Sequence, residues 1–199
     1  FKSCHLPAQG VGLGRLEFII ASHVRIHPNA LINYGKLKQE NKKKKTSYIT
    51  KLIKEIDNLV YAYEDKTQFY VDELARGIGK IGATFFPHPV IIRFSDFKTN
   101  EYRTLIGGEL YEPQEENPML GWRGASRYYD PKFREAFGLE CKAMKIVRGD
   151  MGLSNVIPMI PFCRTPEEGK KVIEVMKENG LDRAKDKELK VYVMCEIPS

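Results

Sequence analysis

Four short runs of apolar residues predict buried β-strands in this chain. They cover residues 11–20, 90–94, 156–162 and 191–197. The first run carries two charged residues, Arg15 and Glu17. Continuous apolar runs, rather than alternating ones, are typical of parallel strands that are covered on both faces. The pattern therefore predicts a parallel sheet.

Between these runs, apolar residues recur at helical spacing. Helices are predicted over residues 49–60, 67–77, 130–149 and 165–180. Asp130 and Thr165 are good N-cap residues, and each is followed by a proline, which is favoured at the first helical position. Glu168 completes a capping-box pattern with Thr165, and Gly180 is a natural C-cap. Strands thus alternate with helices along the chain.

This alternation predicts a βα repeat. A nucleotide-binding fold is disfavoured, because no Walker loop is present and Gly10, Gly12 and Gly14 lack the third glycine of a dinucleotide fingerprint. A β/α barrel is favoured instead. A complete (β/α)8 barrel takes about 250 residues, whereas this chain has 199 and ends directly after a predicted strand. We therefore predict an α/β fold, the N-terminal part of an incomplete (β/α)8 TIM-type barrel.

Residues 1–199 are predicted to form this partial barrel as one domain. Residues 21–89 separate the first two predicted strands, which indicates a helical insertion at about residues 30–85. A parallel strand without its following helix would leave an unprotected edge. The expectation is that the chain is a fragment of a longer polypeptide.

The composition, 42% apolar and 29% charged, is typical of a globular chain with one sizeable core. No apolar run of about 18 residues or more is present, which excludes a membrane-spanning helix. The start of the chain also lacks the build of a signal peptide. Its cysteines, without any C-x-x-C pair, predict reduced thiols in a cytoplasmic protein rather than a zinc knuckle or a disulfide framework. They are Cys4, Cys141, Cys163 and Cys195.

The net charge is +6, and much of the excess lies in the lysine-rich residues 36–45. A solvated loop or helix end is the favoured interpretation of this run. Nucleic-acid binding is the alternative, but the run has no interleaved aromatic residues and no recognition module follows it. The prediction is therefore that the lysines lie in solvent, with no nucleic-acid partner.

Charged residues gather where the predicted strands end, which is where β/α barrels place their chemistry. One interpretation is a buried ion pair, either Arg15–Glu17 or Arg93–Asp96. The other is that Arg15 and Arg93 converge on a phosphate or carboxylate, since guanidinium groups bind such oxygens bidentately. Glu196 would then be one ligand of a hard cation such as Mg²⁺.

The loop at residues 115–127 holds the only tryptophan, Trp122, together with Arg123 and Arg127. It could be a capped surface turn. The glycines on either side of the Trp122–Arg123 pair indicate instead a close backbone approach to a ligand or to another chain segment.

Four stretches resemble the phosphoenolpyruvate (PEP)-binding barrel of the PEP-utilising enzymes. They are G-V-G-L-G-R-L-E-F at 10–18, V-I-I-R-F-S-D-F-K-T-N-E-Y at 90–102, E-N-P-M-L-G-W-R-G-A-S-R at 116–127 and M-C-E-I-P-S at 194–199. The motifs occur in the family's order and span the chain. The ending S-D-F-K-T-N-E-Y is similar to the phosphoenolpyruvate synthase (pyruvate, water dikinase) branch.

The resemblance implies an enzyme that converts ATP, pyruvate and water to AMP, phosphate and PEP, as in gluconeogenesis. A phosphohistidine on a swivelling domain of the same polypeptide would carry the phosphoryl group to pyruvate in this barrel. Arg15 and Arg93 would hold the phosphoryl group and substrate oxygens, and Arg123 is a further substrate-binding candidate. Glu196 would bind substrate through its Mg²⁺. A homodimer is also expected, because family members are often dimers.

Other parts of the family's machinery are predicted to lie outside this chain. These are the second metal ligand, the proton-handling cysteine, the phosphohistidine and the ATP-binding domain, and no cysteine here matches the family's motif. The chain alone is therefore predicted not to catalyse the overall reaction. The histidines are predicted to be structural or exposed: His5, His23, His27 and His88.

Two other assignments remain open. Pyruvate, phosphate dikinase and the first enzyme of the phosphotransferase system share the same barrel. A non-catalytic barrel remnant that binds an anion or a partner protein is the alternative from a different class.

Overall fold

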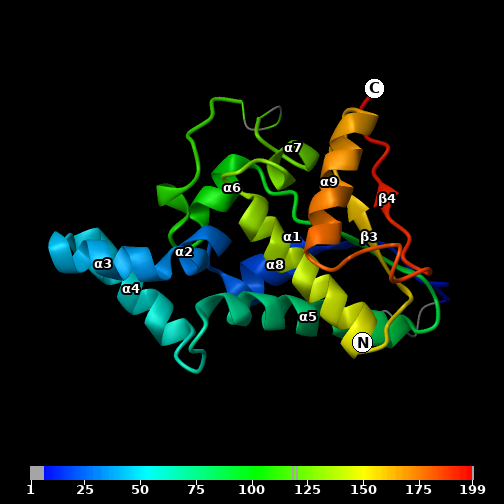
Figure 1. Cartoon of the computed structure of the whole chain (residues 1–199), viewed down its shortest axis with the longest axis horizontal. Coiled ribbons are helices and arrows are strands. Elements are labelled where there is room, and N and C mark those ends of the chain that lie inside the picture. Colours follow the sequence, from blue (N-terminus) through cyan, green and yellow to red (C-terminus); the bar gives the residue numbers. More distant parts are fainter. Residues whose placement is uncertain (1–6, 118, 120, 199) are drawn as a thin grey trace.

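In the part of the chain that the structure describes, four parallel strands form one sheet in the order β1-β2-β3-β4 (Figure 1). This computed structural model describes residues 7–117, 119 and 121–198. The predictions for Cys4, His5 and Ser199, and the motif positions Pro118 and Leu120, lie outside these residues. The strands are β1 (Val11–Arg15), β2 (Val90–Arg93), β3 (Val156–Ile160) and β4 (Tyr192–Val193). The predicted α/β class with parallel strands is confirmed.

The first strand is shorter than predicted. It ends at Arg15, and the chain continues as helix α1 (Leu16–Ile19) and a π-helical turn, η2 (Ile20–Val24). The buried residues Leu16, Ile19 and Ile20 are spaced as on one face of a helix, which explains the change from strand to helix. The prediction of a strand over residues 11–20 was therefore wrong beyond Arg15. The second half of its apolar run is helical.

Four helices connect β1 to β2. They are α2 (Pro28–Ile32), α3 (Tyr34–Lys43), α4 (Ser47–Leu59) and α5 (Lys66–Phe85). In Figure 1, α3 and α4 extend away from the strands, while α5 runs beneath the core. The lysine run lies at the exposed end of α3, as predicted.

Helix α5 continues well beyond the predicted stop at Gly77. Its glycines serve close packing rather than termination. A Cβ at Gly77 would lie 2.8 Å from Ile19, and one at Gly82 would lie 2.7 Å from Val156. Because these positions carry no side chain, α5 approaches both α1 and the sheet closely.

The helices after β2 position the loops at the carboxyl ends of the strands. They are α6 (Thr99–Thr104), η3 (Gly108–Leu110), α7 (Ala125–Tyr128), α8 (Arg134–Lys145), η4 (Ile146–Asp150) and α9 (Pro166–Glu178). The N-cap predicted at Asp130 was wrong, because its Oδ1 accepts from the Lys132 amide (2.8 Å) in a turn before the helix. The N-cap at Thr165 and the glycine at the carboxyl end of α9 are confirmed, but the capping box is incomplete, because Glu168 Oε2 accepts from the Arg164 amide (2.8 Å) and not from that of Thr165. Thr165 Oγ1 accepts from the Glu168 amide, and the amides of Gly180 and Leu181 close the carboxyl end as a Schellman motif.

Helices α5 and α8 pack against each other, and α5 also contacts β2. Aromatic rings from α7, α8 and the residue after β2 fill the space beside them: the Phe94 and Phe137 centroids are 4.9 Å apart, and Tyr128 stacks on Phe137 at 4.2 Å. This core fixes the end of β2, where charged residues begin. No helix in the described residues is long and apolar enough to cross a membrane.

Candidate anion-binding site

The predicted arginines meet at one edge of the sheet. Arg15 ends β1, Arg93 ends β2, and the two are partners in the parallel register. Both line a cavity of about 300 Å³, whose wall also includes Arg123 from the loop before α7. The two strand-end arginines thus lie together as predicted, and Arg123 reaches the same cavity from its loop. Glu196 follows β4 at the same edge but is not part of the cavity wall.

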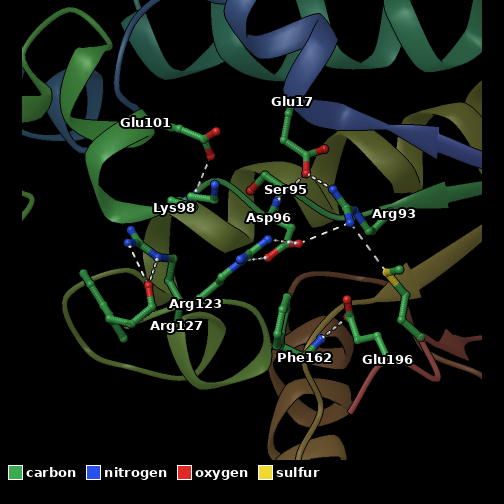
Figure 2. Close-up of polar contacts among 12 residues, drawn as sticks. Glu17, Arg93, Ser95, Asp96, Lys98, Glu101, Arg123, Arg127, Phe162 and Glu196 are labelled. Atoms are coloured by element: carbon green, nitrogen blue, oxygen red, sulfur yellow. Dashed lines mark hydrogen bonds and ion pairs between the residues drawn. The ribbon is translucent and has the colours of Figure 1, made fainter. Parts of the chain in front are cut away.

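Asp96 joins two of the arginines (Figure 2). Its Oδ2 lies 3.2 Å from Arg93 Nη1, and its two oxygens accept from Arg123 Nε and Nη2 at 2.8 and 3.0 Å. The Arg93–Asp96 pair anticipated from the sequence is thus present. The Arg15–Glu17 pair is not, because Glu17 lies on α1 and its Oε1 pairs with Arg93 Nη2.

Arg15 is exposed, contrary to the prediction that the first strand buries it. Since β1 ends at this residue, its side chain leaves the sheet at the cavity. The guanidinium carbon lies 5.7 Å from the centroid of the exposed Phe18 ring. Among the described residues Arg15 forms no ion pair, so its charge is not neutralised within this part of the protein.

The cavity suits an anion. Four cationic and three carboxylate side chains line it. Among the described residues, two buried guanidinium nitrogens, Arg93 Nε and Arg123 Nη1, have no hydrogen-bond partner. A buried donor without a partner costs free energy, so such groups favour a ligand that accepts from them. Phosphate and carboxylate oxygens are acceptors of this kind.

Burial and neighbouring charges shift the pKa values of two side chains that line the cavity, Glu17 and Arg123. Burial raises the pKa of Glu17, and the nearby Arg93 charge only partly opposes this. Burial alone would lower the pKa of Arg123, but its hydrogen bonds to Asp96 and the charges of Asp96 and Glu196 raise it above its ordinary value. Arg123 therefore stays cationic.

Glu196 is exposed and is held by one hydrogen bond. Its Oε1 accepts from the Phe162 amide at 2.8 Å (Figure 2). No cluster of three or more potential metal ligands occurs within the described residues. Mg²⁺ commonly binds one or two carboxylates and completes its shell with water and substrate oxygens. A single exposed carboxylate beside an anion-binding cavity fits such a partial ligand set.

The glycines of the 115–127 loop permit close approach to another chain segment, as the sequence indicated. Gly124 has φ +61°, and a Cβ there would lie 2.6 Å from both Pro161 O and Phe162 Cβ. The Ala125 amide also donates to Pro161 O at 3.1 Å. The loop is therefore fixed against the end of β3, and this contact places Arg123 at the cavity.

Arg127 belongs to the core and not to the cavity. It is fully buried and donates from Nη1 and Nη2 to the two Glu112 oxygens at 2.6 and 2.8 Å. Its guanidinium lies between aromatic rings, 4.0 Å from Trp122 and 4.2 Å from Tyr102. Of the two loop arginines, only Arg123 can reach a ligand.

His27 completes this buried ion pair. Its Nδ1 accepts from the Asn29 amide, so Nε2 carries the proton and donates to Glu112 Oε1 at 2.8 Å. Burial lowers the pKa of His27, which keeps the ring neutral. The prediction that the histidines are structural or exposed is confirmed for His27, and His23 and His88 are exposed. The described cysteines, Cys141, Cys163 and Cys195, are free thiols.

A second buried network lies directly behind Asp96, and nothing in the local sequence indicated it. Glu140 on α8 is fully buried and accepts from both the amide and the hydroxyl of Ser95. Ser95 also bonds Tyr102 Oη at 2.6 Å, and its carbonyl accepts from Tyr128 Oη at 2.7 Å. These bonds fix the backbone from which Asp96 projects.

Glu140 is expected to make stability depend on pH. Burial raises its pKa from 4.5 to about 7, while the Ser95 hydrogen bonds oppose the rise. Between these values the folded state holds a proton that the unfolded state has released. The free energy of unfolding should therefore fall as pH rises through this window, by roughly 3 kcal/mol at most.

Replacing the acid tests this expectation. The amide in Glu140→Gln cannot ionise, so the free energy of unfolding of this variant should not decrease as pH rises through this window. The measurement is amide hydrogen exchange of residues 90–93 in parent and variant at about pH 5 and about pH 7.5, below and above the raised pKa. The same change in protection with pH in both proteins would contradict the assignment.

Comparison with known proteins identifies the family of this chain. Residues 2–199 match the family model described as "PEP-utilising enzyme, PEP-binding domain". The phosphoenolpyruvate synthase of Synechocystis sp. is 57% identical over 199 residues, covering 100% of this chain and 23% of that protein. Those of Aquifex aeolicus and Escherichia coli are 50% and 48% identical, with 27% and 24% of their lengths covered. The chain thus spans about a quarter of the length of these relatives.

Proposed function

Since this chain belongs to the PEP-utilising enzymes and matches their PEP-binding domain, we propose that it is the substrate-binding part of a phosphoenolpyruvate synthase, a pyruvate, water dikinase. The complete enzyme would convert ATP, pyruvate and water to AMP, phosphate and PEP. The step assigned to this domain is transfer of a phosphoryl group from an enzyme phosphohistidine to pyruvate.

The proposed architecture is the N-terminal part of a (β/α)8 TIM-type barrel. Four parallel strands in sequential order, each followed by helices or a loop at the same edge, are what the first half of such a barrel contains. Residues 1–199 would form this partial barrel, with α2–α5 as its helical insertion. The ATP-binding and phosphohistidine domains would belong to other parts of the polypeptide.

The observation that carries the proposal is the cavity lined by Arg15, Arg93 and Arg123. PEP and the transferring phosphoryl group are both rich in anionic oxygens. Phosphoryl transfer needs mainly positioning and neutralisation of charge on those oxygens. Arg15 has no internal counter-ion among the described residues, and Arg93 and Arg123 each have a buried donor to offer. The three together would orient the acceptor and stabilise the charge of the transition state.

Glu196 would contribute one ligand to Mg²⁺. The metal would supply positive charge that stabilises the developing enolate and phosphoryl oxygens. The transfer breaks the P–N bond of the phosphohistidine and forms a P–O bond to the enolate oxygen of pyruvate, whose methyl group loses a proton. The base that accepts this proton would be the family's cysteine, which is expected outside this chain, since Cys141, Cys163 and Cys195 do not line the cavity.

Products distinguish this proposal from its relatives. In the full-length polypeptide containing this chain, incubation with ATP, pyruvate and Mg²⁺ should give PEP, AMP and inorganic phosphate without added phosphate. A pyruvate, phosphate dikinase would need phosphate and release pyrophosphate. The first enzyme of the phosphotransferase system would take its phosphoryl group from PEP and not use ATP.

Two outcomes would contradict the assignment. Pyrophosphate as product would replace the synthase by the dikinase. Absence of any PEP binding would favour a non-catalytic remnant. The 199-residue chain by itself serves as control, since it is expected to form no PEP from ATP and pyruvate.

A further inference from the structure

Phe162 lies where the chain leaves β3, and its backbone is in the left-handed region. Its φ is +46°, whereas β-strand residues have strongly negative values. A bulky residue rarely adopts this conformation, which persists only where surrounding contacts impose it. Strain of this kind gathers at functional sites. The contacts of Phe162 therefore need an explanation.

The backbone amide of Phe162 is directed at Glu196. The N–H donates to Glu196 Oε1 at 2.8 Å and so connects the end of β3 to the end of β4. Glu196 is exposed, and this is the hydrogen bond that restrains its carboxylate in the described part of the protein. The positive φ sets the direction of the ring and of the following chain relative to this amide, so that the N–H meets Glu196 while the ring meets Arg123.

The side chain of the same residue holds Arg123. Its ring centroid lies 4.3 Å from the guanidinium carbon of Arg123 (Figure 2) and 5.9 Å from that of Arg164. One edge of the Arg123 guanidinium is bound by Asp96, and the Phe162 ring covers its face. This leaves Nη1 as the unpaired donor. Two contacts thus fix the direction in which Arg123 can donate.

The ring does not serve the hydrophobic core. Phe162 is half-buried and is neither among the core residues nor among the partly buried residues that pack against them. Its ring lies over the guanidinium of Arg123, and its Cβ lies against the backbone of Gly124. Simple apolar packing does not account for a phenylalanine in this place.

We propose that Phe162 is a positioning residue that orients the anion-binding Arg123 through its ring and the metal-binding Glu196 through its amide. This inference rests on the proposed function, because it presumes that a phosphorylated substrate and Mg²⁺ meet at this site. The proposal adds that the substrate-binding arginine and the metal-binding glutamate are coupled through Phe162. Because this one residue fixes the position of both side chains, displacing it should change both the affinity for PEP and the dependence of binding on Mg²⁺.

Two substitutions separate the ring from the amide. Phe162→Leu removes the aromatic face but keeps the N–H and a similar tolerance of positive φ. Phe162→Val is β-branched and strongly disfavours positive φ, so the backbone around residues 161 and 162 should rearrange and move the N–H away from Glu196. Phe86→Leu is the control: Phe86 is also aromatic but lies at the opposite edge of the sheet, exposed at the end of α5.

The experiment measures PEP binding to the full-length polypeptide by titration calorimetry over a series of Mg²⁺ concentrations. Phe162→Leu should weaken PEP binding roughly tenfold and leave the half-saturating Mg²⁺ concentration unchanged. Phe162→Val should weaken PEP binding at least as much and also raise that Mg²⁺ concentration several-fold. Phe86→Leu should match the parent in both quantities.

The inference is overturned if both Phe162 variants bind PEP within about twofold of the parent with the same Mg²⁺ requirement. It is also overturned if they only reduce the number of binding sites at unchanged affinity, as loss of folded protein would. A parent polypeptide that binds no PEP in Mg²⁺ would instead refute the proposed function, and the inference with it.

Discussion

Arg15→Ala is expected to lower kcat/KM for pyruvate in the full-length enzyme roughly 100- to 1000-fold while leaving its stability unchanged. The guanidinium lines the cavity and has no carboxylate partner in the described residues, so its removal strands no buried charge. It is also exposed, so little packing is lost. The substitution should therefore lower kcat/KM without lowering the free energy of unfolding.

Arg93→Ala should lose at least as much turnover and destabilise the protein as well. Arg93 pairs with both Glu17 and Asp96. Asp96 would keep Arg123, but the buried carboxylate of Glu17 would lose its ion-pair partner. Breaking a buried pair from one side typically costs about 3–5 kcal/mol, and partial exposure of this pair places Glu17 at the lower end or below it.

The two variants therefore form a matched pair for one experiment. Steady-state kinetics and urea unfolding are measured for each, with Arg183→Ala, an exposed arginine outside the cavity, as control. Near-normal turnover in either variant would refute its assigned role at the site. Equal stability losses in both would mean that Arg15 has a buried partner and that its assignment as an unpaired cation is wrong.

The sequence predicted those parts of the site that depend on local pattern. Arg93 and Glu196 each follow an apolar strand, and parallel strands bring such positions to one edge. The cap at Gly180 was likewise readable from a local pattern. The exposure of Arg15 was not, because the apolar run beyond it is compatible with either strand or helix, and only tertiary packing decides between them.

The buried polar contacts between distant segments had no sequence signal, unlike the Arg93–Asp96 pair, whose partners are three residues apart. Glu17 pairs with Arg93 across 76 residues, and Ser95 bonds Glu140 across 45. Such pairs depend on which segments the fold brings together, and the single sequence carries no record of that. Glu112 and Glu140 consequently look like ordinary surface residues in the sequence. The same limit applies to Phe162, whose type suggests core packing until its backbone conformation is known.

Arg127 lies four residues after Arg123, but the same substitution should affect different properties at the two positions: stability at Arg127 and PEP binding at Arg123. Arg127→Met is expected to destabilise the protein by about 3–5 kcal/mol, because it leaves the Glu112 carboxylate buried without a cation. In the parent protein burial lowers the pKa of His27 and keeps its ring neutral, so Arg127 is the cation that balances Glu112. Arg123→Met leaves Asp96 paired with Arg93 and should weaken PEP binding with a much smaller effect on stability.

Pulse proteolysis in urea gives the stability of each variant, and calorimetry gives the PEP affinity of the folded fraction. Arg127→Met should bind PEP with parental affinity once folding is taken into account. Adding Glu112→Gln should recover part of its lost stability, since the stranded charge is removed while an amide still fills the space. If Arg127→Met unfolds at the parental urea concentration, the buried Glu112–Arg127 pair contributes little to stability, and the distinction drawn between the two loop arginines is wrong.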